Sequence, residues 1–221
     1  GTGNPGPDYH SASREGDNLY SCALVALDAD TGKLKWHYQF TPHDVHDWDA
    51  NQIQVLADLT VAGKPRKALI TANRNAFYYV LDRVTGEFLH AAPYAKQTWA
   101  RGIDPKGRPR VIEGTEPTPE GNLVYPSLQG STNWPSPSYS PQTGLFYVPA
   151  NEWSMDIWNE PVSYKKGAAY LGAGFTIKAI HDDHIGVLRA MDPVTGKIVW
   201  ENKNYAPLWG GVLTTAGGLI F

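Results

Sequence analysis

The residues best suited to chemistry lie in one short run, residues 41–51, with the sequence Thr-Pro-His-Asp-Val-His-Asp-Trp-Asp-Ala-Asn. Asp44, Asp47 and Asp49 place three carboxylates within six residues of this run. A hard cation such as calcium takes about six to eight oxygen ligands and tolerates irregular geometry, and a carboxylate can also act as a general base. The run therefore predicts a hard-metal or general-base site. A solvated acidic loop is the alternative that the cluster alone leaves open.

A second polar run, His181-Asp182-Asp183-His184, offers two imidazoles and two carboxylates. These side chains can bind a metal ion. A short run of such residues is more often a solvated loop, so we expect a loop here and keep a second metal cluster as the alternative.

The elements that must position these residues are marked by a recurring motif, Asp-x-x-Thr-Gly. It ends at Gly32, Gly86 and Gly196, and a weaker copy, Ser-Pro-Gln-Thr-Gly, ends at Gly144. The spacings between successive glycines are 54, 58 and 52 residues, a period typical of propeller blades with some long loops. Each copy predicts a hairpin, because apolar alternation precedes it, the glycine can take a positive φ and apolar residues follow in a return strand.

Composition points to the same fold class. Eight Trp and twelve Tyr, together with 22 Gly and 17 Pro, favour many short strands joined by tight turns. We therefore expect an all-β chain, a β-propeller of four-stranded antiparallel blades, with Trp36 and Trp200 packed between neighbouring blades. Residues 91–122 and 151–174 are rich in Pro, Gly and polar residues and predict long loops. The expected strands are residues 19–27, 53–59, 67–71, 77–81, 145–149, 186–191 and 219–221.

Charge and hydropathy exclude several classes of function. The net charge is −3, so the chain has no basic footprint for nucleic acid or an anionic membrane surface. No apolar run approaches the roughly 20 residues that a membrane-spanning helix needs. Cys22 is the single cysteine, so no disulfide can form within the chain.

Several motifs occur in the order in which they are found in the pyrroloquinoline quinone (PQQ)-dependent alcohol dehydrogenases, and the whole chain resembles that family. The motifs are residues 1–5 (GTGNP), 16–19 (GDNL), 30–36 (DTGKLKW), 41–47, 73–83 (NRNAFYYVLDR), 133–134 (NW) and 209–211 (WGG). The resemblance implies an eight-bladed propeller. Residues 1–221 would then be one partial PQQ-type domain of about four blades, incomplete at both ends.

The resemblance also implies roles for individual residues. Asn4 matches the asparagine that ligates the metal beside the quinone, and Asp47 matches the catalytic aspartate, also at the metal. Arg74 matches the arginine that hydrogen-bonds the reactive carbonyl of PQQ. The residues that match the lining of the cofactor pocket are Asn133, Trp134 and Trp209. The family's glutamate metal ligand and its adjacent-cysteine disulfide have no counterpart in these residues.

Asp49 bears on the identity of the metal. A carboxylate two positions after the catalytic aspartate resembles the lanthanide-dependent members, whereas calcium-dependent members more often carry a small or uncharged residue there. Alternate residues of an extended segment point the same way, so Asp47 and Asp49 can face one ion. We expect a lanthanide(III), with Ca²⁺ as the alternative.

The function that the resemblance implies is oxidation of a small alcohol in the periplasm, with hydride transfer to PQQ and electrons passed to a cytochrome c-type acceptor. The remainder of the propeller, or other chains, would complete the ring. Two alternatives stay open: a cofactor-free PQQ-like propeller that serves as a protein-binding scaffold, and an inactive fragment. The scaffold would have no use for Asn4, Asp47, Asp49, Arg74 and Asn133 together, and this favours the enzyme.

Overall fold

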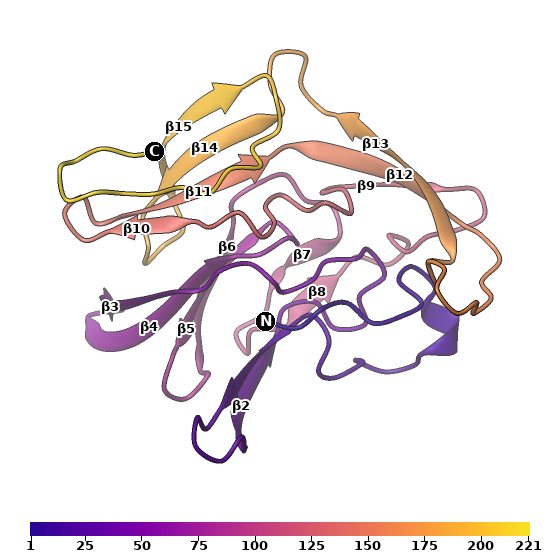
Figure 1. Ribbon diagram of the computed structural model, residues 1–221, viewed down its shortest axis with the longest axis horizontal. Coiled ribbons are helices and arrows are strands. Elements are labelled where there is room, and N and C mark those ends of the chain that lie inside the picture. The colour runs from indigo at the N-terminus through magenta and orange to yellow at the C-terminus, as the bar shows by residue number, and fades with distance from the viewer.

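The computed structural model describes residues 1–221, which form antiparallel sheets and a single short 3₁₀ turn, η1 (Ser11–Ser13). The four-stranded sheets are β3 (Val55–Val61), β4 (Lys64–Ala72), β5 (Phe77–Asp82) and β6 (Phe88–Pro93), and β10 (Ser138–Ser140), β11 (Leu145–Asn151), β14 (Gly186–Met191) and β15 (Ile198–Asn204). The smaller sheets are β1 (Ala23–Leu27) with β2 (Leu34–Gln39), β7 (Ala100–Ile103) with β8 (Pro109–Val111), and β9 (Asn122–Val124) and β13 (Ala173–Ala179) on either side of β12 (Trp153–Asn159). Figure 1 shows the two four-stranded sheets as neighbours in the molecule.

This is the all-β propeller architecture expected from the sequence, as part of a larger propeller. No helix in the structure is long and apolar enough to cross a membrane. The number of blades and the extent of the domain stay predictions.

β5 lies at the centre of the packing, and all six of its residues are buried. Successive side chains of a strand point to opposite faces, so Phe77, Tyr79 and Leu81 join one hydrophobic cluster and Tyr78 and Val80 join another. The first cluster packs β5 against β2, β9 and β12, and the second packs it against β11. The strand therefore packs against neighbours on both of its faces. This packing fixes the position of the loop that precedes it, residues 73–76.

The Asp-x-x-Thr-Gly motif forms the expected hairpin turn in each copy. In the β5–β6 turn the Asp82 carboxylate accepts from the backbone N–H of Thr85 (3.1 Å), and Gly86 N–H donates to the Asp82 carbonyl (2.8 Å). The equivalent carboxylate bonds recur in the other two copies, and the weaker copy forms the turn between β10 and β11. The four turn glycines have φ between +66° and +77°, a region in which an L side chain is strained.

Three expectations about secondary structure were wrong. Residues 91–122 contain the β7–β8 hairpin, and residues 151–174 contain β12, the middle strand of its sheet. β7 and β8 pair with each other, and β12 pairs with β9 and β13, but the Pro-, Gly- and polar-rich composition of these segments does not reveal the pairing. Residues 219–221 form no strand; Ile220 makes only an isolated bridge with Thr214.

The two tryptophans expected between blades differ. Trp36 of β2 packs on the β5–β6 turn, where a Cβ added at Gly86 would lie 2.8 Å from its ring. Trp200 of β15 instead packs against Tyr147 of its own sheet, with ring centroids 5.8 Å apart, and is 39% exposed. The expectation is therefore confirmed for Trp36, and for Trp200 it stays a prediction.

Candidate active site

The acidic loop, residues 41–51, is an irregular segment between β2 and β3 that buried side chains hold in place. The Asp44 carboxylate accepts hydrogen bonds from the backbone N–H groups of Trp48 (3.1 Å) and His46 (3.3 Å). Burial raises the pKa of Asp44 to about 6, although these two bonds lower it. The buried Trp48 indole donates to the Ser127 carbonyl (3.0 Å). The loop is thus anchored both to itself and to the segment after β9.

Arg74 lies at the tip of the tight turn between β4 and β5. Asn73 accepts from the N–H of Asn75 through its side chain (3.1 Å), and the Asn75 side chain accepts from Phe77 N–H (3.0 Å). The Asn75 amide also donates to the Tyr79 hydroxyl (3.0 Å). The flanking asparagines satisfy the buried backbone of the turn and set the direction of the Arg74 side chain.

The guanidinium of Arg74 forms ion pairs with two carboxylates of the acidic loop, those of Asp47 and Asp49. Its Nη1 is 2.8 Å from Asp49 Oδ2 and its Nη2 is 3.3 Å from Asp47 Oδ2. Nη2 also donates to the Leu128 carbonyl. The Arg74 side chain is 5% exposed, so this is a largely buried cluster that combines residues from two separate parts of the chain.

Asp47 and Asp49 converge for a different reason from the one expected. The sequence predicted an extended segment, but Asp47 has a φ of +63°, so the local chain is not extended there. The convergence comes from the shared Arg74 partner and from the capped turn at Asp44. The expectation that both carboxylates could face one ion is compatible with this arrangement.

Asn4 reaches the same cluster through the N-terminal segment. Thr2 N–H donates to Ala23 carbonyl oxygen (2.9 Å), and the Thr2 carbonyl accepts from Ala50 N–H (2.9 Å), so the segment lies between β1 and the acidic loop. The backbone N–H of Asn4 then donates to Asp49 Oδ1 (2.6 Å). The Asn4 side chain donates from Nδ2 to the Pro5 carbonyl (3.4 Å), which leaves its oxygen available as a ligand.

The electrostatics of the cluster are dominated by negative charge. Burial raises the pKa of Asp47 to about 7; Arg74 opposes this, and Asp49 adds to it. Burial also raises the pKa of Asp8, against a lowering hydrogen bond from Asn4, and Asp49 raises it further. The Tyr9 hydroxyl lies 3.5 Å from Asp47 Oδ2. The single positive charge of Arg74 does not neutralise the negative charges of Asp8, Asp47 and Asp49. A bound cation would supply the missing positive charge.

These residues fit both PQQ and a metal ion. The Nε of Arg74 is buried and has no hydrogen-bond partner in the chain. A buried donor of this kind calls for an acceptor, and a carbonyl oxygen of a bound quinone is one. Asp47, Asp49 and the side chain of Asn4 offer the oxygen atoms that a hard cation prefers.

The residues expected to line the cofactor pocket form a second group. Asn133 is 2% exposed, and its amide donates to the Gln129 carbonyl (3.0 Å) while its oxygen accepts from Trp134 N–H (3.0 Å). Trp134 stacks on Trp209, with centroids 5.9 Å apart, and both are substantially exposed. No hydrogen bond joins this group to Arg74, and its cofactor role stays a prediction.

Sequence reasoning missed the residues that connect the two groups. Trp153 packs on Trp209 (centroids 5.7 Å apart) and donates from Nε1 to the Gly130 carbonyl (2.7 Å). Gly130 in turn lies against the Arg74 side chain. Trp153 is 8% exposed, so it is a packing residue that supports the site. Tyr9 and Asp8 were also missed, because nothing in their local sequence separates them from ordinary loop residues.

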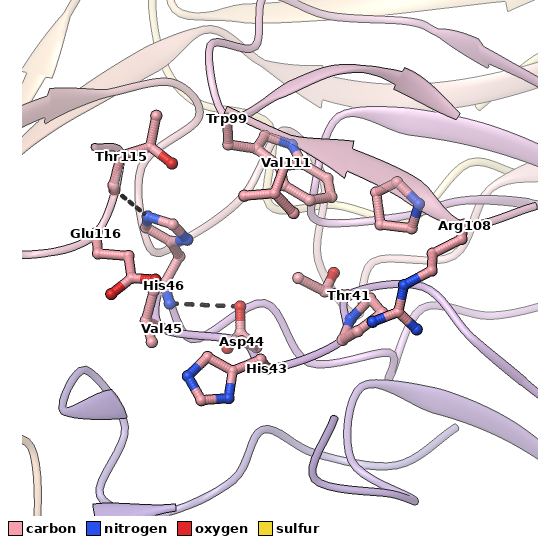
Figure 2. A pocket seen from close by; sticks show the side chains of 12 residues that line it. Thr41, His43, Asp44, Val45, His46, Trp99, Arg108, Val111, Thr115 and Glu116 are labelled. Atoms are coloured by element: carbon pink, nitrogen blue, oxygen red, sulfur yellow. Dashed lines mark hydrogen bonds between the residues drawn. The ribbon is translucent and has the colours of Figure 1, made fainter. Parts of the chain in front are cut away.

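A cavity of about 220 Å³ opens beside the acidic loop (Figure 2). Thr41, Asp44 and His46 line it, together with Trp99 and Glu116. The His46 Nε2 donates to the Thr115 carbonyl (2.8 Å), and burial lowers the pKa of His46 to about 4, so the ring is neutral at pH 7. Asp47, Asp49 and Arg74 do not line this cavity, which is therefore distinct from the Arg74 cluster.

We predict that Gly130→Ala displaces Arg74. An added Cβ would lie 2.6 Å from Arg74 Cβ, and Gly130 has a φ of +74°. We expect a loss of stability of about 2–5 kcal/mol, since positive φ costs an L residue roughly 1–2 kcal/mol and overpacking about 1–3 kcal/mol. Denaturant unfolding of the full-length protein measures it. Gly144→Ala, at φ +66° with nothing within 4 Å of the added Cβ, is the matched control; equal losses in the two variants would contradict a clash with Arg74.

The chain is similar to a protein-family model, to several known proteins and to solved structures, and these agree with one another. Residues 1–96 match the family described as "Glucose/ethanol/alcohol dehydrogenase, beta-propeller domain". The whole chain is 53% identical to the quinoprotein alcohol dehydrogenase PedH of Pseudomonas putida, and 39% identical to the lanthanide-dependent methanol dehydrogenase of Methylacidiphilum fumariolicum. A solved europium-containing methanol dehydrogenase superposes over 100% of the chain with a TM-score of 0.94 at 40% identity. The chain covers 38%, 37% and 39% of these three proteins, so it spans a little over a third of their length.

Proposed function

Because the chain belongs to the family of PQQ-dependent quinoprotein alcohol dehydrogenases, we propose that it supplies the base, the cofactor-contacting arginine and part of the metal site of an enzyme that oxidises a small alcohol to the aldehyde. The observation that carries the proposal is the buried guanidinium group of Arg74. It holds Asp47 and Asp49 through its two terminal nitrogens and leaves its Nε without a partner.

Asp47 is the general base in this proposal. Removing the hydroxyl proton of an alcohol requires a carboxylate that is ionised at the working pH. The Arg74 guanidinium 3.3 Å away favours the ionised form, and a neighbouring metal ion would favour it further. The Tyr9 hydroxyl, 3.5 Å from Asp47 Oδ2, lies beside that carboxylate oxygen.

Arg74 serves the cofactor as well as the carboxylates. Its unpartnered Nε can donate to an oxygen that becomes negative during the reaction, and such a buried donor needs no reorganisation when the charge develops. When bound, PQQ supplies the two-electron redox chemistry and the metal supplies Lewis acidity. The chain supplies the position and charge of Asp47 and Arg74.

We propose a trivalent lanthanide as the metal, with Asn4, Asp47 and Asp49 among its ligands. The excess of carboxylates around one guanidinium supports a highly charged ion, and the similarity to a lanthanide-dependent and to a europium-containing methanol dehydrogenase supports it too. The periplasmic location and the cytochrome c-type electron acceptor are part of the same proposal and rest on the family resemblance. No observation favours the cofactor-free scaffold.

Metal titration of the full-length, PQQ-loaded protein tests this proposal. We expect alcohol-dependent reduction of a dye that requires a light lanthanide, and a shift of activity toward calcium in Asp49→Ala, because the site loses one carboxylate. Asp58→Ala, which removes an exposed carboxylate of β3, is the control. Activity of the wild type with calcium alone, or an unchanged metal preference in Asp49→Ala, would return the assignment to calcium. No alcohol oxidation with any metal would overturn the proposed function.

A further inference from the structure

A second group of metal-ligating side chains gathers where the β13–β14 loop meets the start of β12. Glu152, which lies between β11 and β12, His181 and His184 place one ligand atom each within 4.8 Å of one another. His184 is 2% exposed and the Glu152 side chain is 9% exposed. The expectation of a solvated loop at residues 181–184 is therefore wrong for His184, because the fold brings Glu152 over the loop.

Both imidazoles direct the same ring atom at one carboxylate oxygen. His181 Nε2 is 2.5 Å and His184 Nε2 is 3.5 Å from Glu152 Oε2. The two rings stack, with centroids 4.2 Å apart and an interplanar angle of 11°. Ligands of a tetrahedral zinc ion are about 3.3 Å apart, given zinc–ligand distances of about 2.0–2.2 Å. Because the lone pair of an imidazole nitrogen lies in the plane of its ring, binding one ion requires an opening of about 1 Å between His181 and Glu152 and a rotation of the partly exposed His181 ring out of the stack.

The hydrogen bond on the far side of His184 determines its tautomer. His184 Nδ1 lies 2.5 Å from Asp183 Oδ1. A carboxylate can only accept, so Nδ1 carries the proton. In the neutral ring, Nε2 then presents a lone pair to Glu152 Oε2, which is also an acceptor. Two buried acceptors that face each other are unfavourable unless a cation lies between them. The carboxylate–histidine pair is also the usual outer-shell arrangement of a metal-binding histidine.

The neighbouring arginine, Arg189, pairs with only one of the two oxygens of Glu152. Arg189 Nη2 pairs with the other oxygen of Glu152, Oε1, and Arg189 Nε is 3.2 Å from Glu201 Oε2. Arg189 therefore holds Glu152 through Oε1, and Oε2 remains directed at the two imidazoles.

We propose that Glu152, His181 and His184 form a binding site for a divalent transition metal of the zinc class. Glu152 Oε2 and the two Nε2 atoms are the ligands, and Asp183 orients His184. Two imidazoles and one carboxylate suit zinc-type ions, whereas calcium and lanthanides require more oxygen ligands. This site shares no residue with the Arg74 cluster.

The position of the site suggests what the metal does. Glu152 precedes Trp153, whose indole donates to the Gly130 carbonyl beside Arg74. A metal ion would tie the β13–β14 loop to the start of β12. We expect it to stabilise the fold around Trp153 without taking part in alcohol oxidation.

Zinc binding to the full-length, PQQ-loaded protein tests the proposal. Isothermal titration with Zn²⁺, checked by metal analysis after dialysis, should reveal one equivalent in addition to the metal at the Arg74 cluster. His181→Ala and Glu152→Gln should weaken this binding by about 100-fold or more, because each removes one of the three protein ligands. Asp183→Asn should weaken it by about 10- to 100-fold. The zinc-dependent rise in the unfolding temperature should disappear in His181→Ala.

Controls separate this site from general histidine binding and from misfolding. His90→Ala, which removes a partly buried histidine on β6, should leave zinc binding unchanged. Ca²⁺ in excess should not compete. Because His181 is partly exposed, His181→Ala should fold, and Co²⁺ in place of Zn²⁺ should give visible absorption in the wild type that this variant lacks. Absence of the additional zinc equivalent, or unchanged affinity in His181→Ala, would overturn the proposal and mean that a proton closes the network.

Discussion

Asp47→Asn is expected to lower alcohol turnover of the full-length, PQQ-loaded protein by about 10²- to 10⁴-fold, the contribution usual for a general base. The asparagine keeps the shape of the side chain, and its oxygen can still accept from Arg74 Nη2, now 3.3 Å from Asp47 Oδ2. It cannot accept the proton of the alcohol. Binding of PQQ should be largely retained. Dye-linked turnover together with the absorption of bound PQQ measures the two effects separately.

Asp58→Asn is the matched control for this substitution. Asp58 also pairs with an arginine, Arg83, at 2.9 Å, but its side chain is 77% exposed and lies on β3. Its replacement should leave turnover unchanged. Wild-type turnover in Asp47→Asn would remove Asp47 from the role of base, and loss of PQQ together with turnover would make it a binding residue.

Arg74→Ala is expected to lower turnover by about 10²- to 10³-fold, as the loss of one donor to a developing negative charge does. The loss of turnover should exceed the loss of PQQ affinity. A second effect acts in the same direction. Arg74 lowers the pKa of Asp47, which burial has raised to about 7, so its removal favours the protonated form, which cannot act as a base. The pH at which turnover reaches half its maximum should therefore rise.

Two further variants define the role of Arg74. Arg74→Lys keeps the charge, but one ammonium group cannot reproduce the fork that reaches Asp47 and Asp49, so its turnover should lie between those of wild type and Arg74→Ala. Arg83→Ala removes an arginine that pairs with the exposed Asp58, and it should have no effect on turnover. Unchanged turnover with weaker PQQ binding in Arg74→Ala would make Arg74 a binding residue only.

The hairpins and the Arg74 turn could be predicted because their structure depends on neighbouring residues. The Asp82 carboxylate and Gly86 belong to one turn of the chain, and the asparagines on either side of Arg74 bond to backbone within two residues. β7, β8 and β12 could not be predicted in the same way. β12 pairs with β9 and β13, which lie in other parts of the sequence, whereas β7 and β8 pair with each other in a hairpin whose composition is that of a loop.

The sequence by itself determined the types of residue at the candidate site, the turns that repeat along the chain and the family to which the motifs belong. Only the tertiary structure decided which atoms meet. It placed Arg74 between Asp47 and Asp49, 27 and 25 residues away, and it left the Nε of Arg74 unpartnered. It also brought Glu152 to His181, 29 residues further along the chain. The physical reason is that these contacts follow from strand register and from buried packing, such as that of Gly130 on Arg74, which no local stretch of sequence encodes.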